Sequence, residues 1–517
     1  MNRPLCFRYP SSRPAGLLLS ATLLLSAGLA FFLPDLRAAQ PAASRDLIRL
    51  ENEKPGTSDW QLTYVRLDTS GPAGTRSPGI EGYCSRQSVV AGETIEFFVS
   101  TEPEGQFTIE IFRMGYYGGL GARLMQTLGP LDGKPQPIPP AGERRIRECR
   151  WEPSARLVIP ADWTSGVYLG RLSRVPNPDG TMPWQSYVIF IVRDDRPADI
   201  LFQCPDNTWQ AYNRWPDTYS LYIDPGNKFA WCNNTVDVSF DRPYGKYVQI
   251  YENPQSVGSG EFLCWEFPLC YWLEQHGYDV SYCSNSDMLT PDRGAKCKAF
   301  ISVGHDEYWD LRQYESVLEM TRRGTCVLFL SGNAVCYVTP FRAGFDGRPN
   351  RIISRKGPFQ GLTMGPEPPQ TTFDYVGPDE GLLLGARNIL PCNGGGDWVC
   401  AKPEHWIFAG TGMKKGDRIR GLVGWEFHGL PAPLPGLEVV ADGFALHGGT
   451  RPVPYQATVH PTAQGGFVFN ASTIFWNTGL SAPPGHMPLW SHNTRPNGPD
   501  PRVQQITHNL LRRAIDR

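Results

Sequence analysis

The segment Gly304–Trp309 reads Gly-His-Asp-Glu-Tyr-Trp and holds the side chains best suited to chemistry. His305, Asp306 and Glu307 combine an imidazole with two carboxyls, a set that binds metals or moves protons. Three polar residues at the start of a helix would also act as caps for its free backbone N–H groups. From these residues alone, a functional and a structural interpretation both stay open.

Two further polar clusters follow predicted strands. Ser331-Gly332-Asn333 comes directly after the strand 327–330, and Thr208–Asn213 follows the strand 200–202. Ligands bind outside the carboxyl ends of the strands in open parallel sheets. If the strands are neighbours, these two clusters and Gly304–Trp309 come together at one edge of a sheet.

The signatures of several common enzyme classes are absent from the sequence. The chain lacks G-x-S-x-G, H-E-x-x-H, a P-loop and a dinucleotide-binding fingerprint, and no Cys lies at a strand–turn–helix elbow. It also lacks C-x-x-C, which disfavours a structural zinc site.

The elements that must position the clusters alternate between strand and helix after residue 198, which indicates a parallel sheet with crossover helices. Residues 340–460 are rich in Pro and Gly and are expected to be irregular. The predicted strands are 200–202, 278–282, 299–303, 326–330 and 467–470, and the predicted helices are 266–275, 311–323 and 503–515.

The preceding part of the chain has the period of two that is typical of strands, with no helical stretch. We therefore predict a multidomain β plus α/β protein. A β-sandwich spans 45–195, residues 194–197 form a linker, and an α/β domain with a mainly parallel sheet spans 198–517. The predicted strands of the sandwich are 94–100, 107–113, 166–172 and 187–192.

The composition excludes two broad classes. The 517 residues include 15 Trp, 21 Tyr and 25 Phe, too many aromatic side chains for a disordered chain. Lys plus Arg number 49 and Asp plus Glu number 51, so no basic excess exists to bind nucleic acid. Gly and Pro together number 54 + 48 = 102, which favours strands, turns and long ordered loops.

The N-terminus resembles an export signal. Arg3, Arg8 and Arg13 precede an uncharged apolar run at 15–33, and small residues follow at Ala38 and Ala39. We expect cleavage near Ala39 and export to the periplasm or the extracellular space. The apolar run is also close to the length that spans a bilayer. The alternative interpretation is therefore that residues 1–39 are retained as an N-terminal membrane anchor.

Cys6 lies in this leader, and 12 of the 13 cysteines remain. An even number in an exported chain predicts disulfides, and we expect one or two bridges. Cys84 and Cys149 fall in the first half of the chain, and Cys392 and Cys400 close a short Gly-rich loop. Buried free thiols are the alternative.

Several segments together resemble one family, the large (beta) subunit of N,N-dimethylformamidase and its exported relatives. Their order and combination carry the resemblance, which covers nearly all of the chain after the leader. The segments are Gly82–Val89, Arg113–Gly119, Gln210–Asn213, Ser239–Tyr244, Trp272–Glu274, Gly277–Val280 and Gly304–Trp309.

The resemblance implies a sandwich like carbohydrate-binding modules, followed by a domain like glutamine amidotransferases without their Cys. It also implies a mononuclear iron, Fe(III), whose ligands are Tyr212, Tyr244 and Glu307. By the same resemblance, His305 lies next to the metal ligands, Asn333 lines the pocket and Glu426 is a further carboxylate; these three are the expected catalytic residues. Phenolates and carboxylates are hard oxygen ligands that suit Fe(III).

The expected function is an exported iron-dependent hydrolase of amide C–N bonds with a small amide as substrate. The alternative is a non-catalytic glycan-binding or scaffold protein of the cell surface. The family's amidase pairs with a small subunit that this chain does not encode, and the leader suggests another compartment, so dimethylformamide is not the expected substrate. Glycan contact by the sandwich, membrane anchoring by residues 15–33 and a homo-oligomer stay open.

Overall fold

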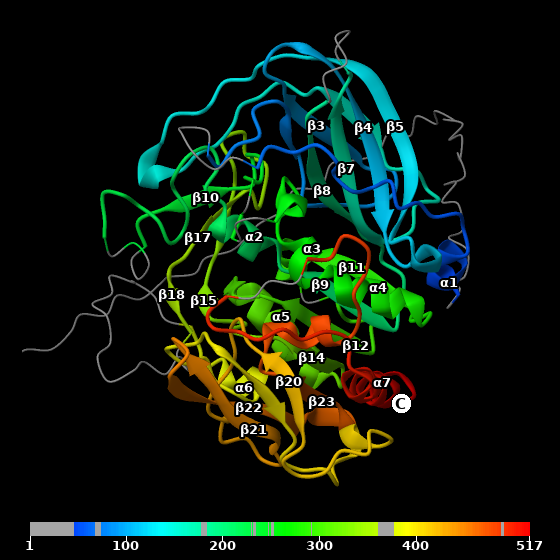
Figure 1. Cartoon of the computed structure of the whole chain (residues 1–517), viewed down its shortest axis with the longest axis vertical. Coiled ribbons are helices and arrows are strands. Elements are labelled where there is room, and N and C mark those ends of the chain that lie inside the picture. The colour runs from blue at the N-terminus through cyan, green and yellow to red at the C-terminus, as the bar shows by residue number, and fades with distance from the viewer. Residues whose placement is uncertain are drawn as a thin grey trace, which may run out of the picture. The chain divides into compact units, whose positions relative to one another are not determined.

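The computed structural model describes residues 46–517 except 68–73, 177–182, 229, 231–233, 247, 250–252, 291, 360–376 and 488–490. Most of its regular structure is β-sheet, with few helices (Figure 1). Residues 43–517 form one compact unit. The predicted leader at 1–39 lies outside the described residues. Within the described part, no helix has both the length and the apolar character needed to cross a membrane.

Two sheets occupy the N-terminal part, and all their strand pairs are antiparallel except β2 with β8. The four strands predicted there are confirmed. The buried side chains of both sheets form one hydrophobic cluster, which includes Phe97, Ile109 and Phe190. The first sheet has three strands in the order β1 (Glu81–Cys84), β3 (Thr94–Ser100), β6 (Ala155–Val158). The second sheet has five strands in the order β2 (Ser88–Val89), β8 (Gln185–Val192), β7 (Gly166–Arg174), β4 (Gly105–Met114), β5 (Ala122–Gly133).

The five-stranded sheet has two buried faces at β7 and β8 but not at its edge strand β5, which is largely half-buried or exposed. Its second face carries Phe112, Leu169 and Ile191, which belong to the hydrophobic cluster of the rest of the protein. All eight residues of β8 are buried for this reason. A short helix, α1 (Leu47–Asn52), precedes these sheets, in a stretch where the sequence predicted no helix.

The largest sheet has nine strands, and five of them are parallel. These five strands were all predicted from the sequence. Their order is β11 (Val280–Ser284), β9 (Ile200–Cys204), β12 (Ala299–Gly304), β14 (Cys326–Ser331), β23 (Phe467–Asn470). Two small three-stranded sheets lie elsewhere: β10 (Asp237–Ser239), β17 (Ile352–Ser354) and β16 (Phe341–Arg342), and β13 (Tyr308–Trp309), β15 (Tyr337–Val338) and β18 (Gly357–Pro358).

The three predicted helices form and have the expected end signals. The side chain of Asp310 accepts a hydrogen bond from the backbone N–H of Arg312 and caps α5 (Leu311–Arg322). Asp500 caps α7 (Pro501–Ile515) in the same way. Gly277 follows α4 (Phe267–Gln275) with φ of +67°, a conformation that favours glycine. The remaining α-helices are α2 (Asp206–Tyr212), α3 (Phe262–Trp265) and α6 (Gly381–Leu384).

The expectation that residues 340–460 are irregular is wrong. They supply four more strands, which extend the parallel strands in antiparallel pairing and make the nine-stranded sheet mixed. Pro452 and Pro454 hid the longest of these strands, but both lie in the half of β22 that has no β23 partner, where a missing N–H is tolerated. The four strands are β22 (Arg451–Pro461), β21 (Glu438–His447), β19 (Gly395–Val399) and β20 (Arg418–Val423).

The expected disulfides are not formed among the described cysteines, all eleven of which are free. Cys84 packs in the core of the two N-terminal sheets, whereas Cys149 packs with Trp151 and Trp215. Burial raises the pKa of the Cys149 thiol well above its usual value. The buried thiols, nine of the eleven, therefore act as small apolar core groups. Cys6 and Cys232 lie outside the described residues.

A buried ion pair joins the five-stranded sheet to α4. Arg113 on β4 donates two hydrogen bonds to the Glu274 carboxylate, at 2.8 and 2.9 Å, and both side chains are fully buried. Asn52 and Tyr282 donate two more, at 2.8 and 2.9 Å. Four hydrogen bonds thus compensate the buried carboxylate for the loss of water, as a buried charge requires.

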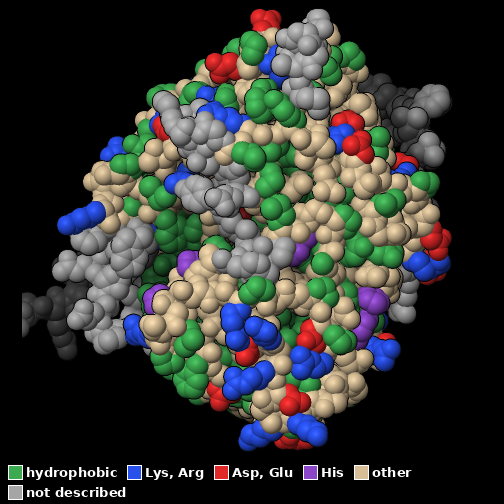
Figure 2. Space-filling view, viewed as in Figure 1, with side chains coloured by type: hydrophobic (Ala, Val, Ile, Leu, Met, Phe, Trp, Pro, Cys, Tyr) green, Lys and Arg blue, Asp and Glu red, His purple; other side chains and the backbone are tan. Residues whose placement is uncertain are grey.

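The charged surface is mixed. On the face drawn in Figure 2, basic side chains lie close to acidic ones. Several exposed pairs are local, such as Arg323 with Glu319 on α5. Pairs of this kind contribute little to stability because water screens them.

Candidate functional site

His305 and Glu307 lie in the loop that follows β12. The loop turns at Gly304, whose φ is +63° and where an added Cβ would lie 2.8 Å from the Cβ of Trp265. Only glycine fits this turn without strain. Both side chains are buried, with exposures of 0% for His305 and 2% for Glu307.

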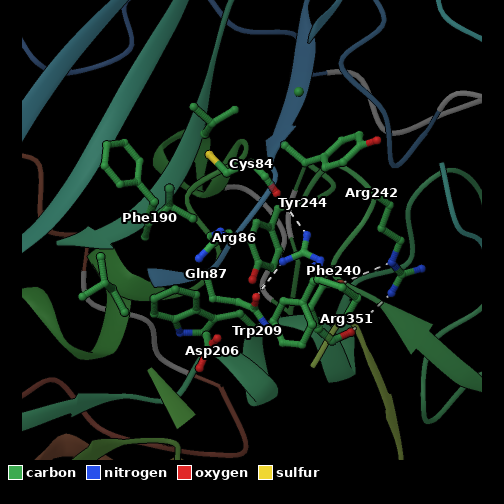
Figure 3. A pocket seen from close by; sticks show the side chains of 16 residues that line it. Cys84, Arg86, Gln87, Phe190, Asp206, Trp209, Phe240, Arg242, Tyr244 and Arg351 are labelled. Carbon is green, nitrogen blue, oxygen red and sulfur yellow. Dashed lines mark hydrogen bonds between the residues drawn. The ribbon is translucent and has the colours of Figure 1, made fainter. Parts of the chain in front are cut away.

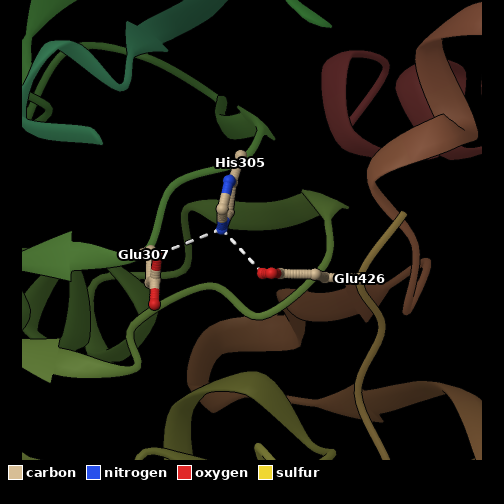
Figure 4. Close-up of side chains that lie close together, drawn as sticks. All are labelled: His305, Glu307 and Glu426. Carbon is tan, nitrogen blue, oxygen red and sulfur yellow. Dashed lines mark ion pairs between the residues drawn. The ribbon is translucent and has the colours of Figure 1, made fainter. Parts of the chain in front are cut away.

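Glu426 reaches the same place from the segment after β20. Its Oε2 lies 2.8 Å from Nε2 of His305, and Oε2 of Glu307 lies 3.1 Å from that nitrogen (Figure 4). One ligand atom from each of the three residues lies within 4.8 Å of the others. Residues more than 100 positions apart in the sequence therefore form one buried His–Glu–Glu cluster.

Asn333 completes the polar cluster from the end of the neighbouring strand, β14. Its Nδ2 donates to Oε2 of Glu426 at 2.9 Å and to Oε1 of Glu307 at 3.3 Å. The pairing of β12 with β14 brings the two strand ends together, as the sequence predicted.

Two tyrosines donate to Glu307. Tyr212, the last residue of α2, donates to Oε2 at 2.8 Å, and Tyr222 donates to Oε1 at 2.6 Å. Their rings stack with centroids 4.9 Å apart. Tyr308 donates in turn to the hydroxyl of Tyr222. The Arg355 guanidinium covers the Tyr222 ring at 4.5 Å.

The electrostatics of the cluster follow from burial and from these pairs. Burial opposes the charged form of His305, but Glu426 and Glu307 outweigh it and raise the pKa of His305 well above its usual value. Burial also favours the neutral form of Glu426, but His305 and Asn333 lower its pKa. Burial and the Glu307 carboxylate raise the pKa of Tyr212 and of Tyr222 well above their usual value.

These residues fit a metal ion. Neither ring nitrogen of His305 has a hydrogen-bond partner of acceptable geometry in the described part of the chain, although two carboxylates lie at ion-pair distance from Nε2. An imidazole, two carboxylates and two phenols offer nitrogen and oxygen donors in one buried place. A bound cation would also favour ionised phenols, which burial and Glu307 otherwise oppose.

Tyr244 lies at a different place in the structure. It lines a cavity of about 30 Å³ with Trp209, Arg242 and Arg351 (Figure 3), and its ring centroid is 6.2 Å from that of Trp209. The cavity has room for about one or two water molecules. Among the described residues, the phenols that hydrogen-bond Glu307 are those of Tyr212 and Tyr222.

The structure thus brings together five of the six site residues named from the sequence: Tyr212, His305, Glu307, Asn333 and Glu426. Sequence reasoning missed Tyr222. It lies in a segment without regular structure, and Ser220-Leu221-Tyr222 has no motif that would have marked it.

Comparison with known proteins agrees with the motifs. Among curated proteins, no sequence matches the chain. The family model described as "N,N-dimethylformamidase beta subunit-like, C-terminal" matches residues 108–492, well over half of the 517 residues. That range contains every residue of the cluster. The chain therefore belongs to the N,N-dimethylformamidase beta subunit-like family.

Proposed function

We propose that the protein is an exported, iron-dependent hydrolase that cleaves the C–N bond of a small amide. The name of its family supports an amide hydrolase. The observation that carries the proposal is the buried convergence of His305, Glu307 and Glu426. In the same proposal, the two N-terminal sheets form a sandwich like carbohydrate-binding modules, and the parallel strands form an amidotransferase-like layer.

The residues that would hold the iron are Glu307 and the two phenols that contact it, Tyr212 and Tyr222. Three anionic oxygen donors would balance the charge of Fe(III) and leave positions open. When bound, the metal would supply a Lewis acid that polarises the amide carbonyl and acidifies water.

The neighbouring side chains have separate tasks. His305 can hold a proton at Nε2, because Glu426 and Glu307 stabilise its charged form, and can deliver that proton to the leaving amine. Glu426 fixes the ring. Asn333 donates from Nδ2 to both carboxylates and so orients them; if a substrate carbonyl oxygen gains negative charge, it would take over one of these two hydrogen bonds.

Iron content and colour test the proposal. Protein made in iron-rich medium is expected to contain one iron per chain and to absorb visible light through tyrosinate-to-iron charge transfer. Tyr212→Phe and Tyr222→Phe each remove one oxygen and keep most ring packing, so each is expected to lower iron content and colour.

Tyr244→Phe is the matched control. It is expected to retain iron, because Tyr244 lines a separate cavity. Loss of iron from this variant alone would reinstate Tyr244, as the family resemblance implied, in place of Tyr222. A colourless wild type without iron would contradict the hydrolase and favour the non-catalytic glycan-binding or scaffold alternative.

A further inference from the structure

The turn that carries Asn333 has an unfavourable backbone. Asn333 and Val335 have φ of +50° and +53°, in the left-handed region, which asparagine tolerates and most other residues with a Cβ avoid. For Val335, which is β-branched, this conformation is a genuine outlier. Such conformations persist only where the surroundings impose them.

The side chain of His428 contacts this turn. Its Nε2 accepts a hydrogen bond of 3.0 Å from the backbone N–H of Ala334, the residue between Asn333 and Val335. Its Nδ1 lies 3.0 Å from Oδ1 of Asn470, and the backbone N–H of Ser472 donates to that same oxygen at 2.9 Å.

These contacts define the tautomer of the ring. Nε2 accepts, so the proton is on Nδ1, which donates to Asn470. Burial lowers the pKa of His428 to about 4, in agreement with a neutral ring. The side chain is fully buried and bridges β23 and the turn.

Further contacts tie the turn to the cluster. The backbone N–H of Val335 donates to the carbonyl of Asp306 at 3.0 Å, and Nδ2 of Asn388 donates to the carbonyl of Ala334 at 3.0 Å. The turn therefore has one orientation, and that orientation directs Nδ2 of Asn333 toward Glu307 and Glu426.

We propose that His428 is a positioning residue for Asn333. By holding the Ala334 N–H, it keeps the strained turn in the conformation in which Asn333 orients the Glu307 and Glu426 carboxylates. This inference deepens the proposed function and rests on it for its consequence at the metal.

Two variants at His428 separate the hydrogen bonds from ring packing. His428→Phe keeps a planar ring and removes both bonds. His428→Gln restores an acceptor for Ala334 and a donor for Asn470. Co²⁺ titrated into metal-free protein is the probe, because partners that orient metal ligands typically change metal affinity by about 10–100-fold.

His428→Phe and Asn333→Ala are each expected to raise the Kd for Co²⁺ by about tenfold. The double variant is expected to bind no more weakly than Asn333→Ala, because His428 acts through Asn333. His428→Gln is expected to recover most of the affinity. The proposal would be overturned if the increase in Kd of the double variant were the product of the increases in the two single variants. It would also be overturned if His428→Phe bound Co²⁺ with wild-type affinity.

Backbone hydrogen exchange of the metal-free protein gives a test that does not depend on metal. The peptide 331–337 is expected to exchange about tenfold faster in His428→Phe and at the wild-type rate in His428→Gln. Unchanged exchange in His428→Phe would refute the positioning role. If that variant does not fold, Asn470→Ala replaces it, because it removes the acceptor that orients the ring, and the same acceleration is expected.

The two readouts also separate the inference from the proposed function. A wild type that binds neither iron nor Co²⁺ contradicts the hydrolase, whereas the exchange rates still decide whether His428 holds the turn.

Discussion

Glu274→Gln is expected to destabilise the whole protein, because it leaves the Arg113 guanidinium buried without its counter-charge. Glu274 accepts four hydrogen bonds of 2.8–2.9 Å, two of them from Arg113. Glutamine keeps the shape and one acceptor, but it turns an NH₂ group toward donors. Breaking a fully buried pair from one side costs about 3–5 kcal/mol.

This loss is large relative to the free energy of unfolding of about 5–15 kcal/mol that is usual for folded proteins. With an m-value near the upper end of the usual range, about 3 kcal/mol/M, the urea midpoint is expected to fall by about 1–1.7 M. Tryptophan fluorescence and circular dichroism are the measurements, and the two probes are expected to give one coincident transition with an unchanged m-value.

Glu319→Gln is the matched control. It removes the same charge from an exposed pair with Arg323, and no measurable change of the midpoint is expected. A double variant, Arg113→Met with Glu274→Leu, is expected to recover only part of the stability: it removes the unpaired buried charge, but it leaves Asn52 and Tyr282 without their acceptor. An unchanged midpoint for Glu274→Gln would refute the reasoning, as would two separate transitions of which only one shifts.

Three further predictions concern the site and the leader. The pKa of Glu426 is lower in the folded protein than its unfolded value of 4.5, so the ionised carboxylate stabilises the fold above that pH, and this stabilisation is lost as the pH falls. In metal-free Glu426→Gln, the free energy of unfolding is therefore expected to decrease less on acidification than in the wild type. Gly332→Ala would place a Cβ 2.1 Å from the carbonyl oxygen of Glu426 and is expected to lower both the melting temperature and the metal content, whereas Gly498→Ala, with nothing within 4 Å, is expected to change neither. N-terminal sequencing of protein from an exporting host is expected to find a start near Ala39, and an intact Met1 in the membrane fraction would instead indicate an anchor.

Much of the fold was predictable because local patterns agreed with tertiary structure. The five parallel strands are short, apolar and bounded by Gly, Pro or polar residues, and the helices α4, α5 and α7 carry ordinary end signals. The strands at 395–461 were not predictable, since their Pro and Gly content suggests turns. What stabilises them is sheet pairing: β22 pairs with β23, and β21, β19 and β20 continue the sheet from β22, partners that periodicity does not identify.

The candidate site was predictable where it lies at strand ends. His305, Glu307 and Asn333 follow β12 and β14 directly, so their proximity follows from parallel pairing. Tyr222 and His428 were not predictable, because each acts through a contact with residues far away in the sequence. The free cysteines were missed for another reason, namely that a count of thiols does not tell a buried core position from a bridge.

The five-stranded sheet, with two buried faces at β7 and β8, limits how this protein can be taken apart. One face packs on the three-stranded sheet, and the other supplies Phe112, Leu169 and Ile191 to the main hydrophobic core of the protein. Cutting the gene at the 194–197 segment would leave each half with a bare apolar surface and a prospect of aggregation. In evolutionary terms, the N-terminal sheets are not a detachable module, and a transplant of this site to another scaffold would have to bring them along.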